Sequence, residues 1–111
     1  MNKERVFLLH ILESIQRIEA MAQSSTREEF DRNKDLQDIV YRRLEIIGEA
    51  VKHLPEEIKK KYPEIPWKEI IGTRDILIHA YFTIDTGLIW DIALKRLPEL
   101  KKVVVKLLET F

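Results

Sequence analysis

The chain has 111 residues, of which 45% are hydrophobic and 34% are charged, so it is long enough for one domain with a core. Lys and Arg together number 19, as do Asp and Glu, and the formal net charge of zero argues against a basic coat for nucleic acid. The sequence has no cysteine, which excludes disulfides, cysteine-ligated zinc and thiol catalysis. We expect a single domain over residues 1–111.

No hydrophobic run in the sequence approaches the ~20 residues that a membrane-spanning helix needs. The apolar run Val6–Leu12 is short, contains His10 and is followed by Glu13 without a small-residue cleavage site. It therefore indicates one face of a helix and not a signal peptide. We expect a cytoplasmic protein that makes no use of a membrane.

Hydrophobic residues recur at steps of three and four in the first half of the chain, which is typical of amphipathic helices. The pattern predicts a first helix from about Asn2 to Ala22. Thr26 and Glu29 have the spacing of a capping box, which predicts a short second helix ending near Arg32. A third helix is predicted over Lys34–Leu54.

Gly48 lies in the middle of the predicted third helix, where glycine costs about 1 kcal/mol relative to alanine. The expected compensation is the close approach of another backbone, since glycine has no side chain to keep a neighbour away. Ile46 and Ala50 widen the apolar stripe of this helix, so we expect it to be buried on more than one side.

Prolines divide the second half of the chain. Pro55 ends the third helix, and residues 55–62 fit a short helix or a turn. A fourth helix is predicted from about Pro66 to Tyr81 or Phe82, because proline suits the first turn of a helix.

A fifth helix is predicted over residues 88–108, where Pro98 should kink the helix or split it. No segment shows the alternation of a strand. The sequence therefore predicts an all-α fold: an antiparallel bundle of four main helices with one or two short extra ones.

Four polar residues interrupt the apolar end of the fourth helix, and their spacing sorts them into pairs. Arg74 and Tyr81 are seven residues apart and fall within ~20° of one line, while Asp75 and His79 are four apart and face each other. Arg74 and His79 are roughly 140° apart around a regular helix. They can act on one ligand only if the helix end is distorted or if a second subunit completes the site. A symmetric dimer with this helix at its two-fold axis would do the latter.

The chemistry of these residues suits cleavage of a phosphodiester without metal. An imidazole can take a proton from a ribose 2′-hydroxyl or give one to the leaving oxygen. A guanidinium stays charged and can bind two phosphate oxygens as negative charge develops. Asp75 could orient His79 or hold Arg74.

A purely structural interpretation fits the same four residues, and spacing alone does not decide between the two. Arg74 and Asp75 could form a surface ion pair, worth ~0–1 kcal/mol. His79 could be a hydrogen-bonded core histidine, and Tyr81 a buried aromatic residue with a satisfied hydroxyl.

Other clusters carry weaker signals. The three histidines are scattered without ligand spacing, so we expect no metal and no cofactor. Lys59–Lys61 is interpreted as a solvated face more than as a grip on RNA. Trp67 and Trp90 are interpreted as core or dimer contacts more than as platforms for stacking bases.

The residues around the motif resemble a known family, HepT, of the HEPN superfamily (higher eukaryotes and prokaryotes nucleotide-binding). Arg74, His79 and Tyr81 match its R-x4-H-x-Y motif within a similar stretch from residue 65 to residue 85. Further similar patterns lie in residues 44–51, at Trp90 and in residues 97–100. The resemblance covers nearly the whole chain.

The resemblance implies a HEPN helical bundle that forms a homodimer, with the motifs of both chains lining one cleft. It implies a metal-independent endoribonuclease toxin, in which Arg74 and His79 are catalytic and Asp75 is supporting. It also implies a type VII toxin–antitoxin pair, whose MntA-type nucleotidyltransferase antitoxin transfers AMP from ATP onto Tyr81. The family often has Asn where this chain has Asp75, and a carboxylate cannot donate a hydrogen bond to phosphate as an amide can.

Two alternatives stay open at this stage. One is a HEPN dimer that binds a nucleotide or a nucleotidyltransferase partner without cutting RNA. The other is an assembly protein whose helical faces serve only to oligomerise. RNA cleavage with metal chelated separates the enzyme from both.

Overall fold

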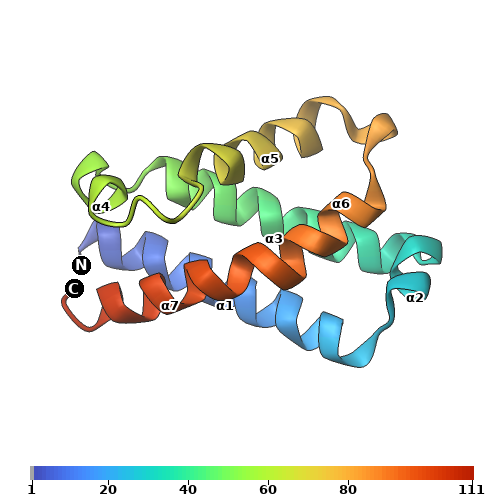
Figure 1. Cartoon of the computed structure of the whole chain (residues 1–111), viewed down its shortest axis with the longest axis horizontal. Helices are drawn as coiled ribbons and strands as arrows, with labels where there is room; N and C mark the ends of the chain where they lie inside the picture. Colours follow the sequence, from blue (N-terminus) through green and yellow to red (C-terminus); the bar gives the residue numbers. More distant parts are fainter. Residues whose placement is uncertain (1) are drawn as a thin grey trace.

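The computed structural model describes residues 2–111 apart from the side chain of Tyr81, and this described part contains helices and turns without a strand. Four main helical segments run alternately up and down as an antiparallel bundle (Figure 1). They are α1 (Lys3–Ser24), α3 (Lys34–Lys52), α5 (Trp67–His79) and a last segment of α6 (Thr86–Asp91), a π-helical turn (Ile92–Arg96) and α7 (Leu97–Leu108). The short helices are α2 (Arg27–Arg32), α4 (Glu56–Lys61) and a 3-10 turn (Tyr81–Thr83). The all-α prediction is confirmed.

The first two helices both have N-terminal caps, of which the sequence predicted the second. The side chain of Asn2 accepts a hydrogen bond from the backbone N–H of Glu4 at 2.8 Å and so caps α1. Thr26 and Glu29 form the expected reciprocal capping box at the start of α2. α1 then buries the face that points at α3 and α7, where four apolar side chains are fully inaccessible: Leu8, Ile11, Ile15 and Ile18.

α3 and α5 approach each other closely at Gly48. A β-carbon at this position would lie 2.6 Å from the β-carbon of Arg74 and 3.2 Å from the carbonyl oxygen of Ile70. The expected close approach is therefore confirmed, and the residue that approaches is the motif arginine. The bare backbone of Gly48 is what lets Arg74 lie against α3.

The two tryptophans lie in the core, as the sequence suggests. Trp67 begins α5, and its indole N–H donates to the carbonyl oxygens of Tyr62 at 2.9 Å and Lys59 at 3.0 Å. These bonds tie α5 to the end of α4. Trp90 packs against Phe30 with ring centroids 5.4 Å apart, which ties α6 to α2.

Pro98 follows directly on a distortion of the last helical segment, where the sequence predicted a kink or a split. Proline has no N–H to give to the carbonyl four residues earlier, and its ring clashes with that carbonyl. The chain accommodates this with the π-helical turn, in which the N–H of Leu97 reaches back five residues to the carbonyl of Ile92. The helix therefore continues past Pro98 with a local bulge.

Membrane insertion through a helix finds no support in the described residues. None of their helices combines the length and the apolar character that crossing a bilayer requires.

Substituting Gly48 by alanine should destabilise the protein. The added carbon meets a β-carbon and a backbone oxygen, neither of which is the flexible end of a side chain. Such overpacking costs typically ~1–3 kcal/mol, which offsets the gain of about 1 kcal/mol in helix propensity. Urea denaturation should therefore give a lower free energy of unfolding for Gly48→Ala.

Gly72→Ala is the matched control, because nothing lies within 4 Å of the added carbon in the same helix pair. This variant should gain about 0.5–1 kcal/mol from helix propensity alone. Equal gains for the two variants would show that α3 and α5 have no need of a glycine at their contact.

Candidate functional site

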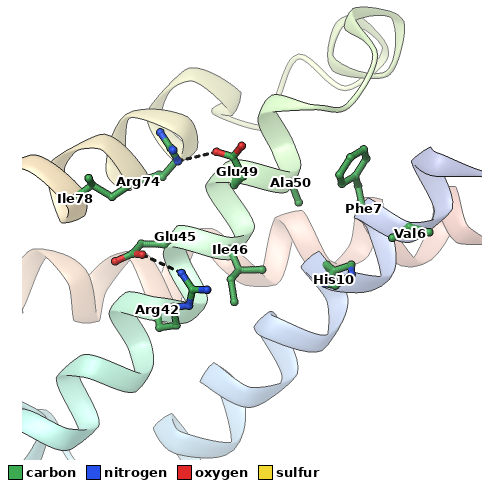
Figure 2. Close-up of a pocket in the computed structure, with 10 residues that line it drawn as sticks. All are labelled: Val6, Phe7, His10, Arg42, Glu45, Ile46, Glu49, Ala50, Arg74 and Ile78. Atoms are coloured by element: carbon green, nitrogen blue, oxygen red, sulfur yellow. Dashed lines mark hydrogen bonds and ion pairs between the residues drawn. The ribbon is translucent and has the colours of Figure 1, made fainter.

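Arg74 lies on α5 with its guanidinium held between carboxylates from two helices. Its Nε atom is 2.8 Å from Oε2 of Glu49 on α3, and its Nη1 donates to Oδ1 of Asp75 at 2.9 Å (Figure 2 shows the contact with Glu49). The side chain of Arg74 is 25% exposed. Asp75 therefore contacts Arg74, which fits two interpretations that the sequence left open: a residue that holds the arginine and a surface ion pair. Solvent still reaches the side chain of Arg74.

Glu49 connects Arg74 to a second group of side chains. Its Oε1 is 3.0 Å from Nε2 of His53, one helical turn further along α3. The ring of His53 stacks on Phe7 of α1 with centroids 5.2 Å apart and an angle of 13° between the planes. The buried Oε2 of Glu49 accepts no aligned hydrogen bond within the described residues, so its contact with Arg74 is an ion pair.

The charge of Glu49 is favoured by its partners. The hydrogen bond with His53 lowers the pKa of this carboxyl below its ordinary value, and the positive charge of Arg74 acts in the same direction. Partial burial opposes both effects but does not reverse them. Glu49 is therefore ionised and can hold the guanidinium at neutral pH.

Sequence reasoning assigned no role to Glu49, although a signal for one was present. Gly48 marks the point of close approach, and its neighbour in sequence is a carboxylate. A charged residue beside a predicted helix crossing is a candidate partner for whatever the other helix presents there.

His79 is the last residue of α5, and its side chain is exposed. Among the described residues its ring makes no hydrogen bond or ion pair, so it is available to a ligand. Because α5 is a regular helix up to His79, the angle of roughly 140° from Arg74 remains. The structure does not bring Arg74 and His79 together within one chain, and Asp75 contacts Arg74 instead of His79.

Tyr81, the expected modification site, has its backbone in the 3-10 turn that follows α5. Its side chain lies outside the described residues, so its alignment with Arg74 stays a prediction.

Arg74 also lines a groove that crosses α3 between α1 and α5 (Figure 2). The groove has a volume of about 320 Å³. α1 contributes Val6, Phe7 and His10, and α5 contributes Arg74 and Ile78. α3 forms the floor with residues of its 42–50 segment. His79 is not among the lining residues, so the groove and the imidazole lie on different parts of the surface.

The donor sets of the described residues offer no metal centre. Nowhere in this part of the chain do three or more His, Asp or Glu side chains gather closely enough to hold an ion. Arg74 and His79 stay the candidate residues for chemistry, and Glu49 and Asp75 are the partners of the arginine.

Comparison of the sequence with known protein families identifies the family to which this all-helical bundle belongs. The family described as "Ribonuclease HepT-like" matches residues 11–107. The chain belongs to this HepT-like ribonuclease family, as the motif led us to expect.

Curated relatives agree with this membership. A "Putative RNase" of Caldanaerobacter subterraneus subsp. tengcongensis is 42% identical over 98% of this chain and 97% of its own length. A "Probable ribonuclease HepT" of Thermococcus cleftensis is 43% identical over 86% of each chain.

One relative is a longer protein. The "Gamma-glutamylcyclotransferase and putative RNase" of Methanocaldococcus jannaschii is 50% identical over 95% of this chain, which spans only 47% of that protein. No solved structure gives a significant match.

Replacing Glu49 by glutamine should destabilise the protein most at neutral pH. Because the pKa of Glu49 in the folded state is lowered, its charge stabilises the fold above the unfolded-state pKa of 4.5. That stabilisation is lost as the pH falls through the folded-state pKa. Thermal denaturation should show a difference between wild type and Glu49→Gln at about pH 7 that shrinks towards about pH 2.

Glu13→Gln is a suitable control, since Glu13 also forms an ion pair, with Arg17 at 3.2 Å, and both of these side chains are more than half exposed. Exposed pairs of this kind contribute ~0–1 kcal/mol, so its effect should be small at every pH. A Glu49→Gln effect that is equally large at both ends of the pH range would contradict the ionic role of Glu49.

Proposed function

We propose that the chain is a metal-independent endoribonuclease in which Arg74 and His79 are the catalytic residues. The observation that carries this proposal is that α5 presents a fixed arginine in its middle and an accessible histidine at its last residue. Arg74 is fixed by Glu49 and Asp75 at a groove, while His79 is exposed beyond it. Family membership supports the choice of RNA as the substrate.

The proposed reaction is a transfer within the RNA chain. The ribose 2′-hydroxyl loses its proton to an imidazole and attacks the neighbouring phosphorus, while the bond from phosphorus to the 5′-oxygen breaks. A protonated imidazole supplies the proton that the departing 5′-oxygen takes up. The products are a 2′,3′-cyclic phosphate and a 5′-hydroxyl, so DNA, which lacks the 2′-hydroxyl, is not a substrate.

Arg74 would stabilise the negative charge that develops on the phosphate oxygens in this reaction. A positioned cation in a partly desolvated place acts more strongly than one in water. Glu49 and Asp75 pair with the guanidinium before substrate binds, so they hold the side chain of Arg74 in position. The phosphate of the substrate then competes with these carboxylates for the guanidinium.

We propose that the active form is a homodimer. Arg74 and His79 point to different sides of α5, so a two-fold axis near this helix is what would bring an arginine of one chain and a histidine of the other into one cleft. Large apolar side chains at the end of this region support the proposal, since they are exposed in the single chain: Ile76, Ile78 and Phe82 at 51%, 44% and 98%.

Arg74→Ala and His79→Ala should each lower the rate of RNA cleavage by at least ~10²-fold, as expected for loss of a charge-stabilising group or of a proton-transfer group. The assay uses purified protein and single-stranded RNA with a metal chelator present, and the products are tested for cyclic phosphate ends. Arg17→Ala is the control, because Arg17 forms an exposed ion pair with Glu13 on α1. Full activity of either motif variant would remove the assignment, and RNA binding without products would favour a non-catalytic HEPN dimer.

Mixing the two inactive variants tests whether the site is completed by the second subunit. After random exchange, half of the dimers carry one variant chain of each kind, and each of these has one complete site. The mixture should then recover about a quarter of the wild-type rate. If no activity returns, the arginine and histidine act from the same chain.

We further propose that the protein is a toxin controlled by an MntA-type nucleotidyltransferase, which adds AMP to Tyr81. The family resemblance and the R-x4-H-x-Y spacing support this control. The added phosphate would bring fixed negative charge near the motif and compete with RNA for the arginine.

Tyr81→Phe should keep RNA cleavage and toxicity but escape the antitoxin, because it lacks only the hydroxyl that accepts AMP. Mass spectrometry after co-expression should show added AMP on the wild-type protein and none on the variant. An unmodified wild-type protein under these conditions would contradict the proposed control, while leaving the nuclease assignment untouched.

A further inference from the structure

The groove beside Arg74 has a chemistry that differs from that of a phosphate site. Its volume of about 320 Å³ lies in the lower part of the range of about 300–1,000 Å³ that is typical of small-molecule clefts. Carbon atoms form most of the surface that it offers, and five of its ten lining residues are apolar or aromatic. The other five are His10 and two residues of each charge: Arg42, Arg74, Glu45 and Glu49. Apolar walls with balanced charge suit a flat, neutral group with hydrogen-bonding edges.

The two carboxylates of the groove differ in their availability. Glu49 is engaged on both oxygens, by His53 at 3.0 Å and by Arg74 at 2.8 Å. Glu45 has a side chain only 26% exposed and accepts from Nη1 of Arg42 at 3.4 Å. Arg42 is 70% exposed, and an exposed pair of this length is worth ~0–1 kcal/mol. A ligand can therefore take over Glu45 at little cost.

The position of Arg74 indicates which class of ligand would bind in the groove. Arg74 lines the same groove, and in the proposed function its guanidinium binds the phosphate that is cleaved. A nucleobase is joined to that phosphate through a single ribose, so an unpaired base next to the cut lies within reach of the groove. Proteins that recognise single-stranded RNA commonly bind splayed-out bases through apolar contact and hydrogen bonds to their edges.

The carboxylate of Glu45 selects among the bases. It only accepts hydrogen bonds, and its two oxygens suit a ligand that presents two N–H donors side by side. Guanine does so with N1–H and the 2-amino group, whereas the corresponding edges of adenine, cytosine and uracil place an acceptor beside any donor.

We propose that this groove, with Glu45 as its recognition residue, is a nucleobase subsite that binds a guanine next to the cleaved phosphate. The proposal rests on the proposed ribonuclease function and adds a sequence preference to it.

Sequencing the ends of fragments cut from a random single-stranded RNA pool tests the subsite. The wild-type protein should cut next to guanine about tenfold more often than next to other bases, as one paired set of hydrogen bonds allows. Glu45→Gln should lose this enrichment, because an amide presents a donor where guanine requires an acceptor. Glu13→Gln is the matched control: it removes a carboxylate from a similar ion pair, with Arg17 at 3.2 Å, outside the groove, and should keep the enrichment.

A second measurement uses the wild-type protein alone and so does not depend on the folding of a variant. Guanosine 3′-monophosphate should inhibit cleavage at about tenfold lower concentration than uridine 3′-monophosphate. Cleavage without guanine enrichment and with equal inhibition by the two nucleotides would overturn the subsite and leave the nuclease assignment standing.

Failure of the nuclease itself is recognised separately. If the wild type cuts no RNA, the proposed function is wrong, and direct titration then decides the subsite: selective binding of guanosine monophosphate that Glu45→Gln abolishes would support it, and unselective binding would overturn it. Finally, if Glu45→Gln converts dimer to monomer in sedimentation without changing the cut pattern, the groove belongs to a subunit contact and the subsite is refuted.

Discussion

The contact between α3 and α5 at Gly48 is the constraint on which the candidate site depends. The missing side chain allows the two helices to approach until a β-carbon at Gly48 would overlap that of Arg74. This approach places Arg74 against Gly48, and the next residue of α3, Glu49, then forms an ion pair with its guanidinium. The packing of the core and the orientation of the functional cation are therefore one feature of the molecule.

The surroundings of Arg74 show how a small protein can hold a cation ready without burying it. Its side chain is one-quarter exposed, and carboxylates on two helices fix it from different directions. The oxygen of Glu49 that faces Arg74 is covered, but the side chains of Glu49 and Asp75 are 46% and 56% exposed, so the cost of removing their charges from water stays small. A phosphate that arrives can compete for the guanidinium, because what it displaces is a partly solvated contact.

Much of the fold could be predicted from the sequence, because the deciding signals are local. The spacing of apolar residues predicted the main helices, and the spacing of Thr26 and Glu29 predicted the cap of α2. Pro98 predicted a distortion of the last helical segment. Gly48 even indicated a close approach. Helix ends were off by one to a few residues: α3 ends at Lys52 and not Leu54, and α5 ends at His79 before a separate 3-10 turn.

The candidate site was less predictable, since it depends on which helices face each other. The angular positions of Arg74 and His79 follow from one helix alone, but the partnership of Arg74 with Glu49 needs the relative placement of two. The same limit applies to the groove, which combines residues of α1, α3 and α5 that are far apart in the chain. No periodicity within a single segment contains that information.

The two ends of the chain offer one more consequence. Both lie at the same end of the bundle (Figure 1), and Arg5 of α1 donates to the carbonyl oxygens of Leu108 at 3.2 Å and Phe111 at 2.9 Å. Chain ends that lie this close are suited to circular permutation. A short linker could join them, and the chain could be reopened in the turn between α1 and α2. Such a permutant would preserve the pairing of α3 with α5 while giving the protein a new order of synthesis.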